Sequence, residues 1–280
     1  MKFILTLVLL SLHFSGALFG KEYILDKKNY MQPAGTVIEE QMLMTIRDGK
    51  MSVVSNARVM NGVTSSVMSE AVETTIINTN KYRSLMKINH KTGSTVIEGQ
   101  EMPNDIEEEP LLNVLIIFEK KEGKWTAAPE KGKLNILQKK ELAELVEKEN
   151  KEATMYGYKA RKVGDVWGVG LPALKILLGA DELTKGKATV TFKGIEKFEN
   201  MECAALVVTF DVEGKEKEVD VKMKGTANVT RSLEFLLDVK VSGEMDMDMR
   251  GDVQPGVKMQ VKAKAVINQE ASIKVPVIDK

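Results

Sequence analysis

Hydrophobic and polar residues alternate along most of the chain, and this pattern predicts a protein built mainly from β-strands. The most regular stretch is 244–250, where Met245, Met247 and Met249 alternate with charged residues. A period of two directs one set of side chains to a core face and the other to solvent. Similar alternation occurs in the segments 42–46, 51–54, 58–60, 63–68, 82–88, 95–97, 189–192, 204–212, 218–223, 233–241 and 257–267. We therefore expect a mainly β (α+β) fold, a large curved antiparallel sheet or incomplete barrel with one or two covering helices.

Glycine-containing pairs predict where these strands turn. Asp48-Gly49 and Asn61-Gly62 stand between apolar runs, and such pairs are preferred in two-residue hairpin turns because Asp, Asn and Gly tolerate positive φ. They predict two successive hairpins near the start of the mature chain. The same reasoning predicts further turns within the segments 91–94, 122–123, 213–214 and 242–243.

Two segments in the middle of the chain have helical rather than strand patterns. The segment 134–150 carries apolar residues at helical spacing and Glu–Lys pairs four residues apart. A shorter helix is expected over 172–178, with Pro172 in its first turn and Gly179 at its end. The apolar run 111–118 fits either a strand or a buried helix. We expect one β-rich domain over 21–280 with a helical insertion around 134–178.

The first twenty residues have the layout of a secretory signal peptide. Lys2 precedes the apolar run 3–10, and small residues follow before the charged mature chain. Cleavage after Ala17 or Gly20 fits this layout, and the apolar run is short for a transmembrane span, although an uncleaved anchor is the alternative. We therefore expect a signal peptide over 1–20 and an exported protein, periplasmic or extracellular, that is not integral to the membrane after cleavage.

Composition excludes some classes of partner. Forty basic and forty acidic residues balance to no net charge, and aromatic residues make up only 5% of the chain. Nucleic-acid binding needs concentrated positive charge, and single-strand binding also uses aromatic stacking, so nucleic acid is not an expected partner. Cys203 is the only cysteine, so stability should come from burial of a core and not from an intramolecular disulfide.

Residues suited to catalysis or metal binding are scarce. His90 is the only histidine beyond the signal segment, and Cys203 has the sequence context of a small buried residue. Glycine-rich phosphate loops are also absent from the sequence. The carboxylates that alternate with Met245, Met247 and Met249 lie along a straight strand and cannot wrap a calcium ion. We expect a non-enzymatic protein without cofactor or metal; a cleft in which His90, Cys203 or a buried carboxylate pair meet would contradict this expectation.

The methionines form the candidate ligand site. Met245, Met247 and Met249 share one strand face at intervals of roughly 7 Å, and methionine adapts its shape to irregular ligands. The set predicted to line an apolar cavity is Met223, Met245, Met247, Met249 and Met259. A lipid or acyl chain is the expected ligand. The alternatives are copper binding, which lacks a nearby His or Cys, and a fully packed core in a structural protein that binds a protein partner of the bacterial envelope.

Four short motifs occur in a suggestive order: 33–35 (Pro-Ala-Gly), 163–167 (Val-Gly-Asp-Val-Trp), 225–226 (Gly-Thr) and 242–243 (Ser-Gly). In this order the chain resembles an uncharacterised family of exported bacterial β-sheet proteins, defined only as a domain of unknown function. The helix over 134–150 is not part of that pattern. The resemblance implies export and a β-sheet fold, and no activity or site. The expected architecture is also similar to that of envelope carriers of lipids and lipoproteins, a likeness of fold that does not fix function.

Overall fold

The computed structural model describes residues 20–55, 58–103, 109–151, 154–178, 182–216, 219–254 and 256–276. The predicted signal peptide lies outside the described residues except for Gly20, and so does Gly179, the predicted end of the second helix. The long elements that follow are all within the described part of the chain.

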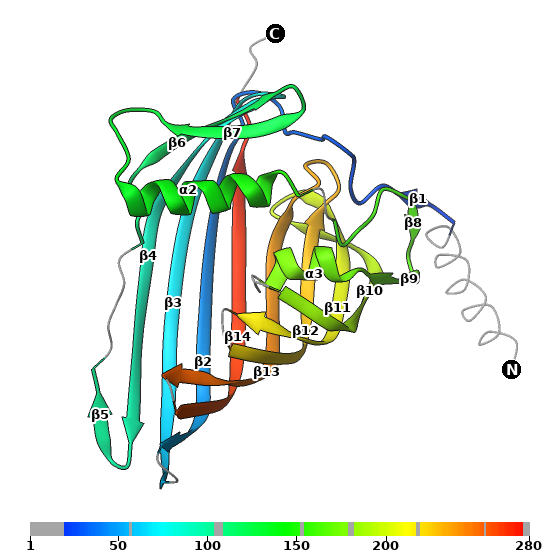
Figure 1. The fold of residues 1–280 in the computed structure, drawn as a ribbon. Coiled ribbons are helices and arrows are strands. Elements are labelled where there is room, and N and C mark those ends of the chain that lie inside the picture. The colour runs from blue at the N-terminus through cyan, green and yellow to red at the C-terminus, as the bar shows by residue number, and fades with distance from the viewer. Residues whose placement is uncertain are drawn as a thin grey trace, which may run out of the picture.

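The described residues form one large antiparallel sheet of twelve strands that is not closed into a barrel. The strand order is β7-β6-β4-β3-β2-β14-β13-β12-β11-β10-β9, with β5 paired to β4. The strands are β2 (Val37–Ser55), β3 (Arg58–Asn78), β4 (Lys81–Ile97), β5 (Gln100–Met102), β6 (Leu115–Lys121), β7 (Lys124–Pro129), β9 (Val166–Val169), β10 (Glu182–Phe198), β11 (Met201–Glu216), β12 (Val219–Ser232), β13 (Asp238–Gln254) and β14 (Val257–Lys274). The strands β1 (Glu22–Tyr23) and β8 (Arg161–Lys162) form a second, two-stranded sheet. The predicted curved antiparallel sheet is confirmed (Figure 1).

The first two predicted hairpin turns are wrong. β2 and β3 run without interruption through Asp48-Gly49 and Asn61-Gly62. Asp48 does adopt a positive φ of 52°, but it forms a β-bulge that bends β2. At Gly62 a side chain would collide with the backbone oxygen of Val96 on the neighbouring strand. Glycine is required at this position because the two backbones approach closely. Close approach of a neighbouring backbone is, besides a β-bulge, a common reason for glycine inside a strand.

The same correction applies to the predicted turns at Gly93, Gly214 and Gly243, which lie inside β4, β11 and β13. At Gly93 and Gly243 a Cβ atom would lie 2.9 Å and 3.0 Å from backbone oxygens of the adjacent strand. In contrast, Glu122-Gly123 does turn the chain, with φ of 51° and 81°, and joins β6 to β7. The apolar run before it therefore ends in a strand.

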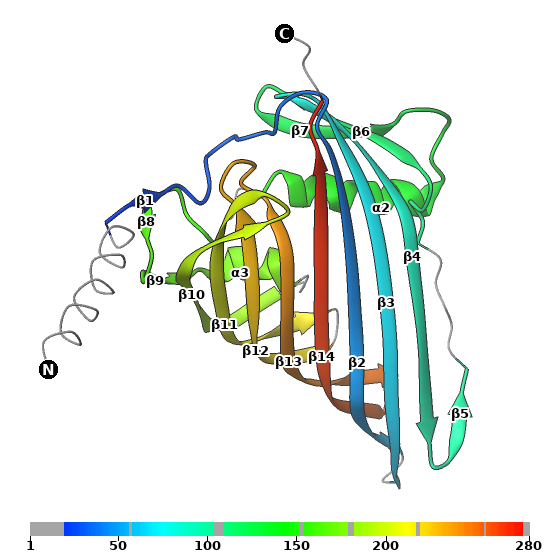
Figure 2. The same cartoon turned by 180° about the vertical axis from the view of Figure 1, so that it is seen from behind.

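Both predicted helices are present, and both lie on one side of the sheet (Figures 1 and 2). They are α2 (Ile136–Glu149) and α3 (Leu171–Leu178). Asn135 caps α2 in a reciprocal capping box with Gln138. Leu142 of α2 packs in a cluster with residues of β2, β3, β4 and β6, whereas Leu174 of α3 packs with residues of β10, β11 and β12. We call the side of the sheet that faces the helices the inner face, and the opposite side the outer face.

A buried polar cluster joins the N-terminal segment to the inner face. Arg231 of β12, which is 6% exposed, donates from Nη1 to Asp238 Oδ1 and from Nε to the Leu25 oxygen, each at 2.6 Å. The Tyr156 hydroxyl donates to Asp238 Oδ2 at 2.7 Å, and the guanidinium lies 4.0 Å from the centre of the Tyr156 ring. Burial opposes the charge on Arg231, but Asp238 and Tyr156 leave its pKa raised.

Candidate functional site

A cavity of about 440 Å³ lies between α2 and the inner face of the sheet. Its floor comes from β2, β3, β4 and β6, and α2 forms part of its wall. Most of the lining is aliphatic or aromatic. The lining residues are Met31, Gln32, Ile38, Glu40, Glu70, Val72, Thr74, Ile76, Tyr82, Ser84, Met86, Leu111, Val114, Ile116, Phe118, Leu145, Lys148, Glu149 and Leu237.

Polar contacts hold α2 near each of its ends. Near its N-terminus, Gln138 donates from Nε2 to the Pro110 oxygen at 3.0 Å. At its C-terminus, the Asn150 amide donates to the Trp125 oxygen at 3.0 Å and its Oδ1 accepts from the Trp125 N–H at 2.8 Å. The helix is therefore fixed to β7 at one end and to the loop before β6 at the other. This arrangement holds it across the cavity.

Two carboxylates stand on the floor of this otherwise apolar cavity. Glu40 of β2 and Glu70 of β3 both point to the inner face, and burial raises the pKa of each. Asp238 and Glu70 raise the pKa of Glu40 further, while Lys148 partly offsets the shift at Glu70. Gln269 donates from Nε2 to Glu40 Oε1 at 3.3 Å. Lys148 and Glu149 of α2 are largely exposed, but the Glu149 carboxyl reaches into the cavity, where it is hydrogen-bonded to Tyr82 and burial raises its pKa.

The predicted methionines occupy a different part of the inner face. Met223, Met245, Met247 and Met249 belong to the cluster around Leu174 of α3, so α3 and not α2 packs near them. Met223 pairs directly with Met247, and Met259 lies apart, opposite Val53 and Gly251. Met223 is 7% exposed, and the other four are partly exposed. The lining of the cavity under α2 includes none of these five methionines.

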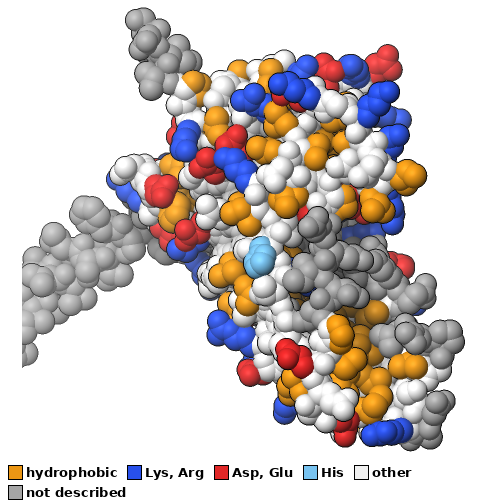
Figure 3. Space-filling model, turned by 90° about the vertical axis from the view of Figure 1, so that its left-hand side faces the viewer, with side chains coloured by type: hydrophobic (Ala, Val, Ile, Leu, Met, Phe, Trp, Pro, Cys, Tyr) orange, Lys and Arg blue, Asp and Glu red, His pale blue; other side chains and the backbone are white. Residues whose placement is uncertain are grey.

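Further methionines extend this surface along the inner face. Met44 pairs with Met68, and Met51 pairs with Val261, which in turn pairs with Met249. We call the methionine face the nine partly exposed methionines on this side: Met42, Met44, Met51, Met60, Met68, Met245, Met247, Met249 and Met259. In Figure 1 no helix lies in front of the lower halves of β2, β3 and β4. Hydrophobic side chains gather at this end of the molecule in Figure 3.

The two glutamates were not predicted from the sequence, although a signal for them exists. Glu40 falls in the alternating series that includes Ile38 and Met42, and Glu70 falls in the series of Met68 and Val72. A carboxylate at a position where the alternation calls for an apolar residue departs from the usual pattern. At Glu40 this departure is hard to see, because the preceding residue, Glu39, is also acidic and lies in the polar series of the same strand.

The structure does not bring Cys203 and His90 together. His90 is exposed on β4, and Cys203 is buried on β11. Strands β3, β2, β14, β13 and β12 separate the two in the sheet. Burial also raises the pKa of the Cys203 thiol, which disfavours the thiolate.

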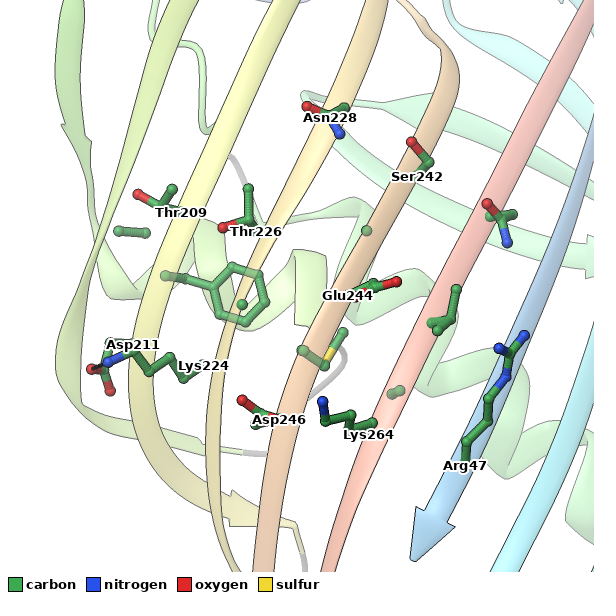
Figure 4. A pocket seen from close by; sticks show the side chains of 18 of the residues that line it. Arg47, Thr209, Asp211, Lys224, Thr226, Asn228, Ser242, Glu244, Asp246 and Lys264 are labelled. Carbon is green, nitrogen blue, oxygen red and sulfur yellow. Dashed lines mark ion pairs between the residues drawn. The ribbon is translucent and has the colours of Figure 1, made fainter.

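A larger hollow of about 1320 Å³ lies on the outer face of the sheet (Figure 4). Its lining contains equal numbers of basic and acidic side chains. The basic residues are Arg47, Lys187, Lys224 and Lys264, and the acidic residues are Asp48, Asp211, Glu244 and Asp246. Asp211 and Lys224 form an ion pair at 3.5 Å, and Asp246 lies opposite Lys224 and Lys264 in the strand register. Because these charges balance across neighbouring strands, this hollow selects no particular class of ligand.

Two further searches of the described residues were negative. They contain no group of three or more His, Cys, Asp or Glu side chains placed to hold a metal ion. Among the described helices, none combines the length and the apolar character needed to cross a membrane.

No protein-family model and no curated protein matches this chain. Among solved structures it is similar to lipovitellin, in a structure on lipid–protein interactions, with 10% identity over 90% of this chain and a TM-score of 0.42. This chain spans only 26% of that lipovitellin chain. It is also similar to a DUF1329 family protein from Desulfovibrio piger, with 9% identity, 89% of each chain covered and a TM-score of 0.22. A protein from a family of unknown function is thus among its structural neighbours.

Proposed function

We propose that this protein binds an apolar small molecule, such as a lipid or another acyl chain, in the cavity under α2, and that its role is binding and not catalysis. The observation that carries this proposal is the cavity itself. Its volume of about 440 Å³ falls in the range of roughly 300–1,000 Å³ that is typical of small-molecule sites. Its mainly aliphatic lining matches a hydrocarbon chain.

A space of this size is not an ordinary packing defect. Part of its surface is open to solvent, so water fills it when no ligand is bound, and an apolar chain that displaces this water gains the hydrophobic free energy of burial. The contacts of Gln138 and Asn150 keep α2 from settling onto the sheet and closing it.

The methionine face offers a path to this cavity. The methionine face runs along β2 and β3 from their ends at Ser55 and Arg58. It passes Met44, Met68 and Met42 and reaches Glu70, which lines the cavity. Flexible, polarisable thioethers can follow the shape of a moving acyl chain. Of the five methionines predicted from the sequence, Met245, Met247, Met249 and Met259 belong to this face, whereas Met223 is buried in the cluster around Leu174.

The leader-like segment 1–20 supports an exported location for this activity, in the periplasm or outside the cell. In that setting the proposed role is to shield an acyl chain from water while it moves through an aqueous compartment. The driving force is the hydrophobic effect, about 0.8 kcal/mol for each buried methylene.

The first test is the binding of the neutral apolar fluorophore N-phenyl-1-naphthylamine to the mature chain. Val72→Phe places extra volume in the cavity floor, and Val67→Phe makes the same change on the outer face of the same strand, where Val67 is 39% exposed. We expect Val72→Phe to weaken binding at least tenfold and Val67→Phe to leave it unchanged. Equal binding by the two variants, or no binding by the wild-type chain, would refute the proposal. Thermal unfolding of each variant checks that it folds.

A second candidate function is supported by one feature of the outer face. Six large apolar side chains are exposed on the outer face of β2, β3 and β4: Leu43, Val54, Val59, Val63, Val67 and Ile88. Exposed apolar patches often mark protein interfaces, so a protein partner of the envelope is the alternative. Chemical cross-linking that captures one partner through a lysine of this face, and loses it when Val63 is changed to Asp, would favour that alternative.

A further inference from the structure

We propose that the ligand of the α2 cavity carries a protonated amine, which the carboxylates of Glu40 and Glu70 bind at the cavity floor. This inference rests on the proposed function and names the chemical class of its ligand: an amphiphile with an apolar chain and a cationic head group.

The strand register places the two glutamates as neighbours that one ammonium group could reach together. In the register of β2 and β3, Glu40 pairs with Val72 and Met42 pairs with Glu70, so the two glutamates are diagonal neighbours on the inner face. Diagonal neighbours on a sheet lie about 7–8 Å apart. An ammonium group between them can therefore donate to both carboxylates, in charge-assisted hydrogen bonds of about 2.8 Å.

These carboxylates have acceptor capacity that the protein leaves unused. Gln269 donates one hydrogen bond to Glu40, and within the described part of the chain Glu70 makes neither a hydrogen bond nor an ion pair. Both side chains are partly buried, and Lys148 is the cation that acts on Glu70; a carboxylate partly withdrawn from water gains from further donors. A ligand ammonium group has three N–H donors and a positive charge, which supply what these two side chains lack.

The other charges at the cavity also favour a cation. Its lining carries three carboxylates, Glu40, Glu70 and Glu149, against one ammonium group, that of Lys148. Glu109 adds further negative charge nearby, since it interacts with Glu70, whereas the charge of Asp238 is paired with that of Arg231. A fatty-acid carboxylate would meet like charges here, and like charges at short range are unfavourable.

The remainder of the lining excludes a simple inorganic cation. Apart from the two glutamates, the floor consists largely of apolar side chains such as Ile38, Ile76 and Phe118. The described residues do not place three potential metal ligands together at any point. A hydrocarbon chain bearing one amine fits both parts of the lining.

The electrostatics of the empty site agree with this assignment. Burial raises the pKa of Glu40 and of Glu70, so their protonated forms are favoured when no cation is present. An ammonium ligand favours the ionised forms and must displace those protons. Binding should therefore strengthen as pH rises through the raised pKa values. The titratable and charged groups that face the glutamates are Tyr82 of β4, Lys148 and Glu149 of α2, and Asp238 of β13.

The experiment compares three probes with the same chain length: dodecylamine, dodecanol and dodecanoate. Each is used at pH 7 below its micelle-forming concentration to displace N-phenyl-1-naphthylamine from the mature chain. We expect dodecylamine to bind at least tenfold more tightly than dodecanoate, with dodecanol between them. In the Glu40→Gln/Glu70→Gln variant, the preference for the amine should fall to less than threefold while dodecanol still binds.

A matched control removes two carboxylates from the same strands on the outer face. Glu39→Gln/Glu73→Gln changes a directly opposed pair of β2 and β3 and should keep the wild-type preference. Equal or tighter binding of dodecanoate by the wild-type chain would overturn the amine assignment and leave the apolar cavity in place. Failure of all three probes to bind would overturn both. Dodecanol binding by the cavity variant shows that it is folded.

Discussion

The buried Arg231 cluster predicts a large loss of stability from one substitution. Arg231→Met keeps most of the apolar stem but removes the charge that faces Asp238, and it leaves the Leu25 oxygen without its donor. Removing one partner of a buried ion pair costs about 3–5 kcal/mol. The Asp238 side chain keeps 23% exposure, so the lower end of that range, about 3 kcal/mol, applies. This loss corresponds to a decrease in Tm of about 6–12 °C.

The assay is thermal and urea unfolding of the mature chain, followed by circular dichroism. Arg250→Met is the matched control, because Arg250 of β13 also pairs with a carboxylate, Asp248, at 2.6 Å, but its side chain is 55% exposed. Exposed pairs contribute little to stability, so this variant should unfold within error of the wild-type Tm.

A second variant tests the physical reason. If the loss comes from the orphaned carboxylate of Asp238, then adding Asp238→Asn to Arg231→Met should recover part of the stability. If Arg231→Met is no less stable than Arg250→Met, the cluster does not anchor the N-terminal segment. If Asp238→Asn makes the Arg231→Met variant still less stable, the loss comes from packing and the electrostatic explanation is wrong.

Three further predictions concern the sheet and the cavity. Gly62→Ala should destabilise the protein by about 1–3 kcal/mol in urea unfolding, because its Cβ would overpack against the Val96 backbone. Asn150→Ala removes the contacts that fix α2 to Trp125, and amide exchange at the end of α2 should accelerate about 5- to 30-fold. Burial raises the folded-state pKa of Glu40, so its contribution to stability is present below the unfolded pKa of about 4.3 and is lost as pH rises through the folded value. Glu40→Gln should therefore raise the Tm at pH 7 and leave it unchanged at pH 4; a gain at both pH values would contradict this.

The sequence was sufficient for the fold class and for the helices, because both depend on local periodicity. The alternation of Met245, Met247 and Met249 with charged residues predicts a strand in any sheet with one covered face. Asn135 and Gln138 likewise define the start of α2 by a local capping box. Features of this kind are determined by neighbours in the sequence, and the structure agrees with them.

The turns and the site depended on pairing between distant segments. By its sequence, Asn61-Gly62 fits a hairpin turn as well as it fits the interior of a strand. Only the close approach of β4 shows that Gly62 is part of a long strand. The position of α2 over Glu40 and Glu70 depends on contacts with Pro110 and Trp125. The sequence pattern shows which face of a strand a residue occupies, but it does not show which helix covers that face.

The contrast between two charged clusters on the inner face supports the choice of the cavity as the functional site. Around Arg231, each buried charge meets an opposite charge or a hydrogen-bond partner, as expected for a cluster that stabilises the fold. At Glu40 and Glu70, two partly buried carboxylates interrupt an apolar face; Gln269 donates one hydrogen bond to Glu40, and Lys148 acts on Glu70 through its charge alone. Local departures from the pattern that stabilises a fold concentrate at functional sites. A protein without a ligand in this cavity would be more stable with glutamine or an aliphatic residue at these positions, so the two carboxylates are best explained by the molecule that completes them.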